Sequence, residues 1–132
     1  MTRKSSKRIP RPVRHLLAPN QLDDLVVQPR LHWQMLLAGH ADQQYQLSII
    51  NLFNIAGSIA YLADKNSLGD KFKAAQEILI DSMNAAAMPT DDEMQFVGST
   101  LNTADSYLGV QSRETIRDAI AFVKGSYQGQ PA

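Results

Sequence analysis

The stretch from Gln43 to Ala63 carries no charged side chain, and it is long enough for about six turns of helix. Its seven Gln, Asn and Ser residues are too many for a helix that faces lipid. Its apolar residues recur at the spacing of one helical face, and they are Ile49, Leu52, Phe53, Ala56, Ile59, Ala60 and Ala63. The stretch therefore predicts a central helix that is buried on most sides, and Gly57 predicts a close crossing with another helix.

The next helix is predicted to begin at Ser67, because Asp70 three residues later completes the spacing of a capping box. It should end near Met88, since Pro89 cannot continue a helix. The apolar residues expected to face the core from this helix are Phe72, Ala75, Leu79, Met83 and Ala86.

Two more helices are predicted after Pro89. Thr90 with Glu93 has the pattern of a second capping box, and Gly109 is a plausible terminator for the helix that follows. Ser112 should start the last helix, with Gly125 just past its end. The residues expected to face the core from these two helices are Met94, Val97, Leu101, Ala104, Leu108, Ile116, Ala119, Ile120 and Val123.

Shorter helical segments are expected ahead of the central helix. Pro29 suits the first turn of a short helix that ends at Gly39, and a further turn of helix is expected at 20–26. No run of residues alternates between apolar and polar in the manner of a strand. We therefore predict an all-α fold, a compact bundle of four main helices plus one or two short N-terminal helices, with an extended basic N-terminal arm.

Composition fits a single soluble domain. The chain has 132 residues, of which 44% are hydrophobic and 20% are charged. We expect an arm at 1–19, one helical domain at 20–125 and a frayed tail at 126–132. The lack of cysteine excludes disulfides, thiolate zinc sites and cysteine nucleophiles, and it is compatible with the cytoplasmic location that we expect.

Charge is divided along a chain whose formal net charge is zero. Residues 1–15 hold no acidic side chain and six basic ones, which are Arg3, Lys4, Lys7, Arg8, Arg11 and Arg14. The remaining chain has 7 basic and 13 acidic residues, so the body carries a net charge of −6. A partner therefore meets a basic arm or an acidic body, according to the face that it approaches.

The arm does not have the pattern of a targeting peptide. Charge and proline interrupt its apolar residues, which disfavours a secretory signal, and Pro10 and Pro12 obstruct the amphipathic helix of a mitochondrial presequence. We expect an extended segment whose six basic residues bind nucleic acid or an acidic partner, and a solvated tail without function is the alternative.

Catalytic and metal-binding motifs are missing from the sequence. There is no G-x-S-x-G, G-x-x-x-x-G-K-[ST], G-x-G-x-x-G or H-E-x-x-H pattern, so we expect no enzyme, catalytic residue, metal ion or cofactor. His32 and His40 are interpreted as residues at a helix end. The acidic run from Asp91 through Asp92 to Glu93 is explained by a helix N-terminus, and it is also a candidate protein interface.

Two further groups of residues are candidates for contacts. Arg30 and Trp33 are interface candidates, with a core position as the alternative for Trp33. Asn51, Asn54 and Ser58 form a polar stripe that predicts a hydrogen-bonded network between helices, with a binding groove as the alternative. We expect no membrane partner, and a homodimer through an apolar helix face is possible for a bundle of this size.

The basic, proline-bearing leader KRIPRPVR at 7–14, followed by a helical body, resembles small accessory proteins encoded by bacterial prophages and plasmids. This resemblance concerns the leader and the layout of the chain. It implies a non-enzymatic regulator or inhibitor of host systems, including defence systems, and it assigns no role to a particular residue.

We hypothesise a non-enzymatic interaction protein that binds and regulates or inhibits a nucleic-acid-handling protein complex, for example as a phage or plasmid counter-defence factor. An acidic helical surface can occupy a cationic groove that is meant for DNA or RNA. The alternative is a protein that binds nucleic acid directly through its arm. An enzyme that uses Asp91, Asp92 or His40 is the third possibility.

Overall fold

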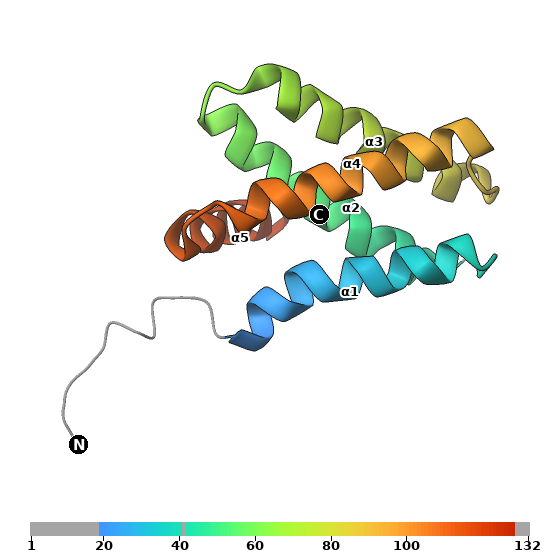
Figure 1. The fold of residues 1–132 in the computed structure, drawn as a ribbon, viewed down its shortest axis with the longest axis horizontal. Helices are drawn as coiled ribbons and strands as arrows, with labels where there is room; N and C mark the ends of the chain where they lie inside the picture. Colours follow the sequence, from blue (N-terminus) through green and yellow to red (C-terminus); the bar gives the residue numbers. More distant parts are fainter. Residues whose placement is uncertain (1–18, 41, 129–132) are drawn as a thin grey trace.

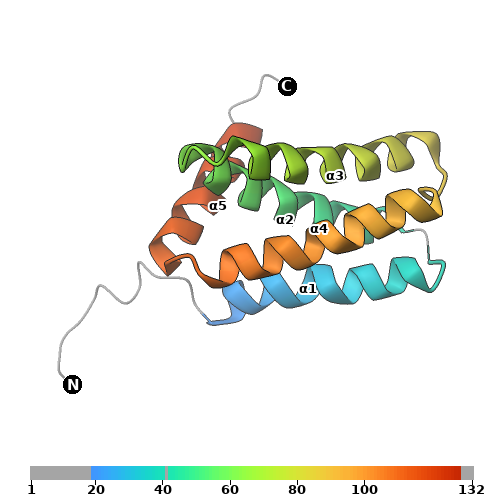
Figure 2. The ribbon, with the colours of Figure 1, turned by 45° about the horizontal axis from the view of Figure 1, so that its top comes forward.

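The computed structural model describes residues 19–40 and 42–128, and in this part of the chain it shows five helices and no strand (Figure 1). The first four helices run back and forth along one direction, and the fifth crosses one end of the bundle (Figure 2). The all-α bundle predicted from the sequence is confirmed. The helices are α1 (Pro19–Leu37), α2 (Gln43–Leu62), α3 (Asn66–Ala85), α4 (Asp91–Gly109) and α5 (Arg113–Gln128).

The uncharged helix α2 lies at the centre of the bundle. It packs against each of the other four helices, and half of its residues are buried. Beside Gly57, α3 crosses α2 so that a Cβ atom on Gly57 would lie 3.7 Å from the Cβ of Phe72. The predicted burial of this helix is confirmed, and its apolar side chains form the centre of the core.

A residue in the left-handed backbone conformation follows each of the first three helices. Gly39 has φ +92°, and the N–H groups of Gly39 and His40 donate back to carbonyls in the last turn of α1, each at 3.0 Å. This is a Schellman arrangement, and it confirms the predicted end of the helix. Asp64 (φ 59°) and Ala86 (φ 53°) take the same left-handed conformation after α2 and α3, without the freedom of glycine.

In the described part of the chain, one helix lies ahead of α2, within the predicted one or two, but it is not short, and the separate turn of helix expected at 20–26 was wrong. α1 is one helix of 19 residues, and Pro29 lies inside it. Proline removes one backbone hydrogen bond from a helix, but Pro29 is buried on the same face as Leu25 and Trp33, so packing outweighs this loss.

Three other predicted boundaries differ from the structure, the first being the end of α3, which lies at Ala85 rather than near Met88 because Ala86 is left-handed. α3 begins at Asn66 with Lys65 as its N-cap and no side-chain cap, so Ser67 lies inside the helix and was wrongly assigned as the cap. The last helix does not stop before Gly125 but continues to Gln128. By contrast, the predicted starts at Thr90 and Ser112 are confirmed, since both hydroxyls accept the backbone N–H three residues later.

Candidate functional site

The α1–α2 turn, the end of α3 and the start of α4 lie together at one end of the bundle (Figures 1 and 2). Gln46 links two of these segments, because its Nε2 donates to Ser82 Oγ at 3.1 Å. The segments have no Lys or Arg, since none occurs at 31–64 or 74–112. They carry five acidic residues that we call the acidic end, and these are Asp42, Asp81, Asp91, Asp92 and Glu93.

Two of these carboxylates hold helix starts in place. Asp42 Oδ1 accepts the N–H of the second residue of α2 at 2.8 Å. Glu93 and Thr90 form a reciprocal capping box, with contacts of 2.8 and 3.2 Å between side chain and backbone. Asp91 and Asp92 are exposed in the first turn of α4, where the helix dipole stabilises negative charge. The acidic end is therefore built on fixed helix termini.

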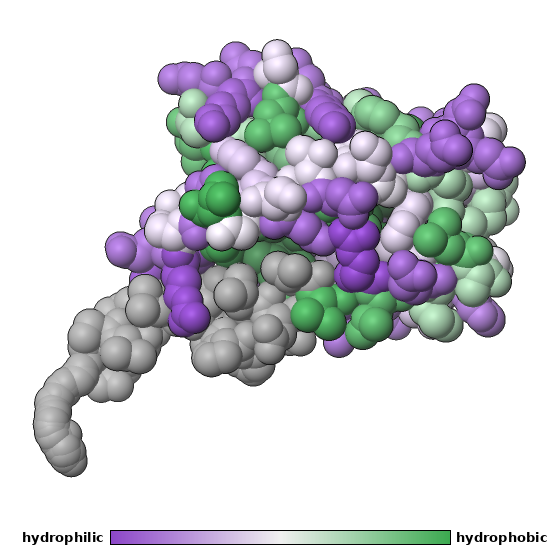
Figure 3. All heavy atoms as spheres, in the orientation of Figure 1, coloured by the Kyte–Doolittle hydropathy of each residue, from purple (hydrophilic) through white to green (hydrophobic). Residues whose placement is uncertain are grey.

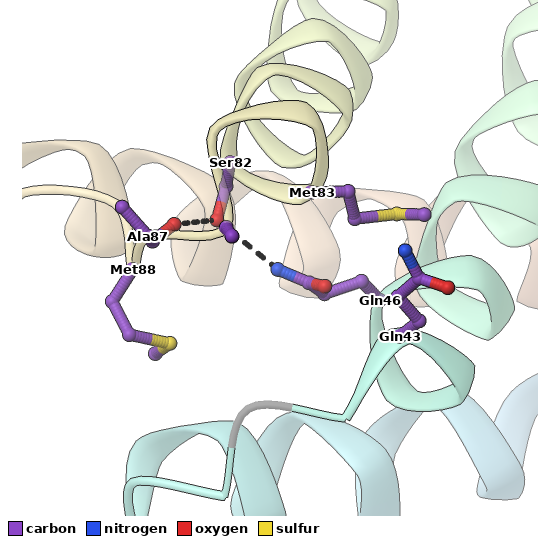
Figure 4. A pocket seen from close by; sticks show the side chains of 7 residues that line it. Gln43, Gln46, Ser82, Met83, Ala87 and Met88 are labelled. Atoms are coloured by element: carbon purple, nitrogen blue, oxygen red, sulfur yellow. Dashed lines mark hydrogen bonds between the residues drawn. The ribbon is translucent and has the colours of Figure 1, made fainter.

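A small hollow lies beside the acidic end, between the start of α2 and the end of α3 (Figure 4). Amide and thioether side chains line it, among them Gln46 and Met83. The Ser82 hydroxyl donates to the Ala87 carbonyl, and this bond ties the α3–α4 turn to the helix. The volume of about 240 Å³ is below the roughly 300–1,000 Å³ of typical ligand pockets. The hollow therefore gives no support to a small-molecule site.

The predicted interface pair of Arg30 and Trp33 joins α1 to α4 instead. Arg30 forms an ion pair with Asp105 and donates to Asn102 Oδ1 at 2.9 Å. Trp33 is only 5% exposed, so the core alternative is confirmed and the interface assignment of Trp33 is corrected. A Cβ on Gly98 would lie 3.0 Å from the Trp33 ring, which explains a glycine inside α4.

The two histidines have different surroundings. His32 lies inside α1 rather than at its end, where its Nδ1 contacts Ser48 Oγ and its ring lies 4.9 Å from that of Tyr45. His40 is exposed just past the end of α1. Within residues 19–40 and 42–128, no group of three or more His, Cys, Asp or Glu is placed to hold a metal ion.

The polar stripe on α2 does not form the predicted network through Ser58. The Ser58 hydroxyl donates to the Asn54 carbonyl of its own helix at 2.8 Å, and Asn51 is exposed. Asn54 and Ser58 instead border a surface hollow that Tyr61 and Gly69 also line. This placement agrees with the groove alternative.

Tyr61 covers Gly69 at the start of α3. A Cβ on Gly69 would come within 2.9 Å of the Tyr61 ring, so the ring occupies the space that a side chain would need. The Tyr61 hydroxyl donates to Asp70 Oδ1 at 2.6 Å. This hydrogen bond is the main reason that the pKa of Tyr61 is raised above 10.0.

An apolar groove lies between the end of α2 and α5. Its volume is about 430 Å³, and most of its lining is apolar, from Ile59, Leu62, Ala63, Ala119 and Phe122. Leu62 is 79% exposed and Phe122 is 60% exposed, which is far more than a core residue would be. The sequence reasoning missed this groove. The available signal was that Phe122 falls outside the predicted inward face of α5.

The remaining predictions concern the basic arm, which lies outside the described residues, and the membrane. The six basic residues of the arm all fall before residue 19, so the structure says nothing of them. In the part of the chain that the structure covers, no helix is long and apolar enough to cross a membrane.

Comparisons with known proteins give no relative. No protein-family model, curated protein or solved structure matches the chain. Any proposal about function therefore depends on the acidic end, the apolar groove and the charge of the arm.

Proposed function

We propose that this chain is a non-enzymatic interaction protein that binds a nucleic-acid-handling protein and blocks or regulates it through the acidic end. The observation that carries the proposal is the placement of five acidic residues at one end of the bundle, on three segments that contain no Lys or Arg. A cationic groove that normally binds phosphates is complementary to such a surface.

The construction of the acidic end suits this role. Three of its residues stand in the first turn of α4, where Glu93 forms the capping box with Thr90, and Asp42 caps α2. Charges on capped helix ends lose little conformational freedom on binding, and this lowers the cost of association. The basic arm would add a second contact, to an acidic surface of the same partner. Such a protein would act in the cytoplasm, for example as a counter-defence factor of a phage or plasmid.

The proposal can be tested by capture followed by inhibition. Tagged full-length protein is incubated with nuclease-treated lysate of the organism that encodes it, and captured proteins are identified by mass spectrometry. The captured protein is then purified, and its binding to labelled duplex DNA and single-stranded RNA is measured at increasing concentrations of the chain. We expect the apparent Kd for nucleic acid to rise in proportion to the chain concentration. A captured protein whose affinity for nucleic acid stays unchanged would contradict the proposal.

Direct binding of nucleic acid through the arm is the second candidate. In the described body, Arg30 and Arg117 are both engaged in ion pairs, with Asp105 and Asp118. Because the body as a whole carries a net charge of −6, phosphate binding would depend mainly on the six cations of the arm. Labelled DNA and RNA are titrated with the full chain, and with a variant whose six basic arm residues are replaced by Gln, over a salt series. Binding by the chain alone that falls steeply with salt and is lost in the variant would favour this candidate.

A further inference from the structure

The apolar groove lies at the end of the bundle opposite the acidic end, and the arm joins the bundle at the end that holds the groove. α1 begins, α2 ends and α4 connects to α5 at this one end (Figures 1 and 2). Figure 3 shows hydrophobic surface near the α4–α5 connection, where Val110 is 79% exposed next to the groove residue Gln111. Clustered exposed apolar residues with a polar rim mark interaction surfaces.

We propose that residues 9–13 of the arm of the same chain occupy the apolar groove. This segment reads Ile-Pro-Arg-Pro-Val, so four apolar residues surround one cation, Arg11. The groove has the matching composition, because Asp118 is the only charged residue among the eight described residues that line it. Proline loses little entropy on binding, and Pro-rich segments bind grooves that are lined by an aromatic ring. Phe122 provides such a ring in this groove.

The exposed side chains of the groove are of a size that a short segment can cover. Phe122 is 60% exposed and Leu62 is 79% exposed, whereas Ile59 and Ala119 form a buried floor. A segment in the groove would remove the two exposed side chains from water, which is the favourable term in this contact. The volume of about 430 Å³ lies in the roughly 300–1,000 Å³ range of ligand pockets. It therefore suits a few side chains and not the roughly 20–30 residues that each side of an interface between folded proteins contains.

Asp118 gives the groove a preference for a basic segment. Its side chain is 72% exposed, and its Oδ1 accepts from Arg117 at 3.2 Å. A carboxylate has about four acceptor positions on its two oxygens, so Asp118 can accept Arg11 as well. Because this pair is exposed to solvent, it fixes the orientation of the segment more than its affinity.

The chain between the segment and α1 is long enough for this contact. Val13 stands six residues before Pro19, and an extended chain of this length spans up to about 20 Å. This reach is about twice the roughly 8–10 Å between the axes of packed helices. α1 packs directly against α2, whose last residues border the groove. The covalent tether also keeps the segment at a high effective concentration, so that weak contacts are enough to hold it.

Docking in the groove would keep the arm away from the acidic end. α2 has 20 residues, and at 1.5 Å per residue it separates the two ends of the bundle by about 30 Å. This separation exceeds the Debye length of about 8 Å at physiological ionic strength. Arg11 and Arg14 of a docked arm therefore do not neutralise the acidic end, which stays open to a partner.

Disulfide trapping in the full chain tests the docking. Because the chain has no cysteine, an introduced pair can react only with itself. Val13→Cys keeps a small hydrophobe in the segment, and Ala63→Cys places the second thiol in the groove. Val13→Cys with Ser67→Cys is the matched control, because Ser67 is a small exposed residue at the same end that is not among the groove residues.

Disulfide formation in oxidised glutathione is followed by mass spectrometry and non-reducing gel electrophoresis. Each rate is divided by the rate at which the matching single-cysteine variant reacts with glutathione, which corrects for the reactivity of each thiol. We expect the groove pair to close at least about tenfold faster than the control pair, because the rate follows the effective concentration of the segment at each position.

Substitutions in the groove show whether its side chains hold the segment. Phe122→Gln in the groove pair should slow closure at least about fivefold, as for a central hydrophobic contact. Leu31→Gln is the control, because Leu31 is 52% exposed on α1 and does not line the groove, and it should leave the rate unchanged. Circular dichroism checks that each variant keeps its helices, and Leu62→Gln replaces Phe122→Gln if that variant does not fold.

Equal corrected rates for the two cysteine pairs would overturn the docking. A groove pair whose rate is the same with and without the groove substitution would overturn it as well. A disulfide that joins two chains, at a rate that rises with protein concentration, would assign the groove to the arm of a second copy and would contradict docking within one chain. No partner is present in this reaction, so none of these outcomes bears on the proposed function.

Discussion

Ala86 is the position where a single substitution should raise stability. It follows α3 with φ 53° and ψ 40°, a left-handed conformation that costs an L-residue about 1–2 kcal/mol. Glycine removes this cost but increases the entropy of the unfolded chain, by about 0.4–1 kcal/mol. Ala86→Gly should therefore raise the free energy of unfolding by about 0.5–1 kcal/mol, which corresponds to roughly 4 °C in Tm per kcal/mol for a chain of this length.

Thermal and urea unfolding, followed by circular dichroism, measure this effect. Ala74→Gly is the matched control, because Ala74 is an exposed residue inside the same helix. There glycine should lower the free energy of unfolding by about 0.5–1 kcal/mol. The two substitutions should therefore change the free energy of unfolding in opposite directions. If both substitutions destabilise the protein equally, the left-handed stop at Ala86 is refuted.

Three other perturbations test the packing and the surface contacts. Gly98→Val should lower the free energy of unfolding by about 2 kcal/mol or more and shift the fluorescence of Trp33, since even a Cβ would lie 3.0 Å from the ring; unchanged stability and emission would refute this contact. Arg30→Met should lower the free energy of unfolding by about 1 kcal/mol at low salt and by less at high salt, because the ion pair is partly exposed. A loss of stability that does not depend on salt would mean that Arg30 stabilises the fold through packing alone. Asp70→Asn should lower the pKa of Tyr61 in an ultraviolet titration. Because the folded pKa of Tyr61 exceeds 10.0, the stabilisation from this hydrogen bond is present below that pH and is lost as pH rises through the folded pKa. An Asp70→Asn variant in which the pKa of Tyr61 is unchanged would contradict the role of this hydrogen bond.

The central helix and the two capped starts were predictable because their signals are local. An uncharged stretch with apolar residues at helical spacing has few alternatives to a buried helix such as α2. Thr90 with Glu93 fixes the start of α4 within four residues. Gly39 likewise signals its left-handed conformation directly.

The wrong boundaries arose where packing outweighs local preference. Pro29 predicts a helix start, yet it lies inside α1 because it is buried among core residues. Ala86 ends α3 in a left-handed conformation that alanine does not signal, and at Asp64 aspartate signals it only weakly. The connections that follow α2 and α3 are short. The geometry of each turn, and not the residue type, therefore determines the left-handed conformation.

The candidate sites were predictable only in part. The run from Asp91 to Glu93 was visible in the sequence, but its place at the same end as Asp42 and Asp81 depends on the antiparallel arrangement of helices. The apolar groove was not predictable, because it forms between residues about 60 positions apart, Leu62 and Phe122. The sequence left Trp33 between an interface and the core, and its 5% exposure in the structure decided for the core.

The most direct test of the acidic end compares two charge variants in the inhibition assay with the captured partner. Asp91→Asn/Asp92→Asn removes two charges from the acidic end, and Asp64→Asn/Glu114→Gln removes two at the opposite end of the bundle. The capping residues Thr90 and Glu93 are unchanged. We predict that the first variant inhibits at least about tenfold more weakly, a loss of about 1.4 kcal/mol, and that its inhibition depends less on salt.

The variant at the opposite end should stay within about twofold of the original chain, because isolated surface changes have small effects. Equal weakening by both variants would mean that net charge alone drives the inhibition. Unchanged inhibition by Asp91→Asn/Asp92→Asn would contradict the role of the acidic end.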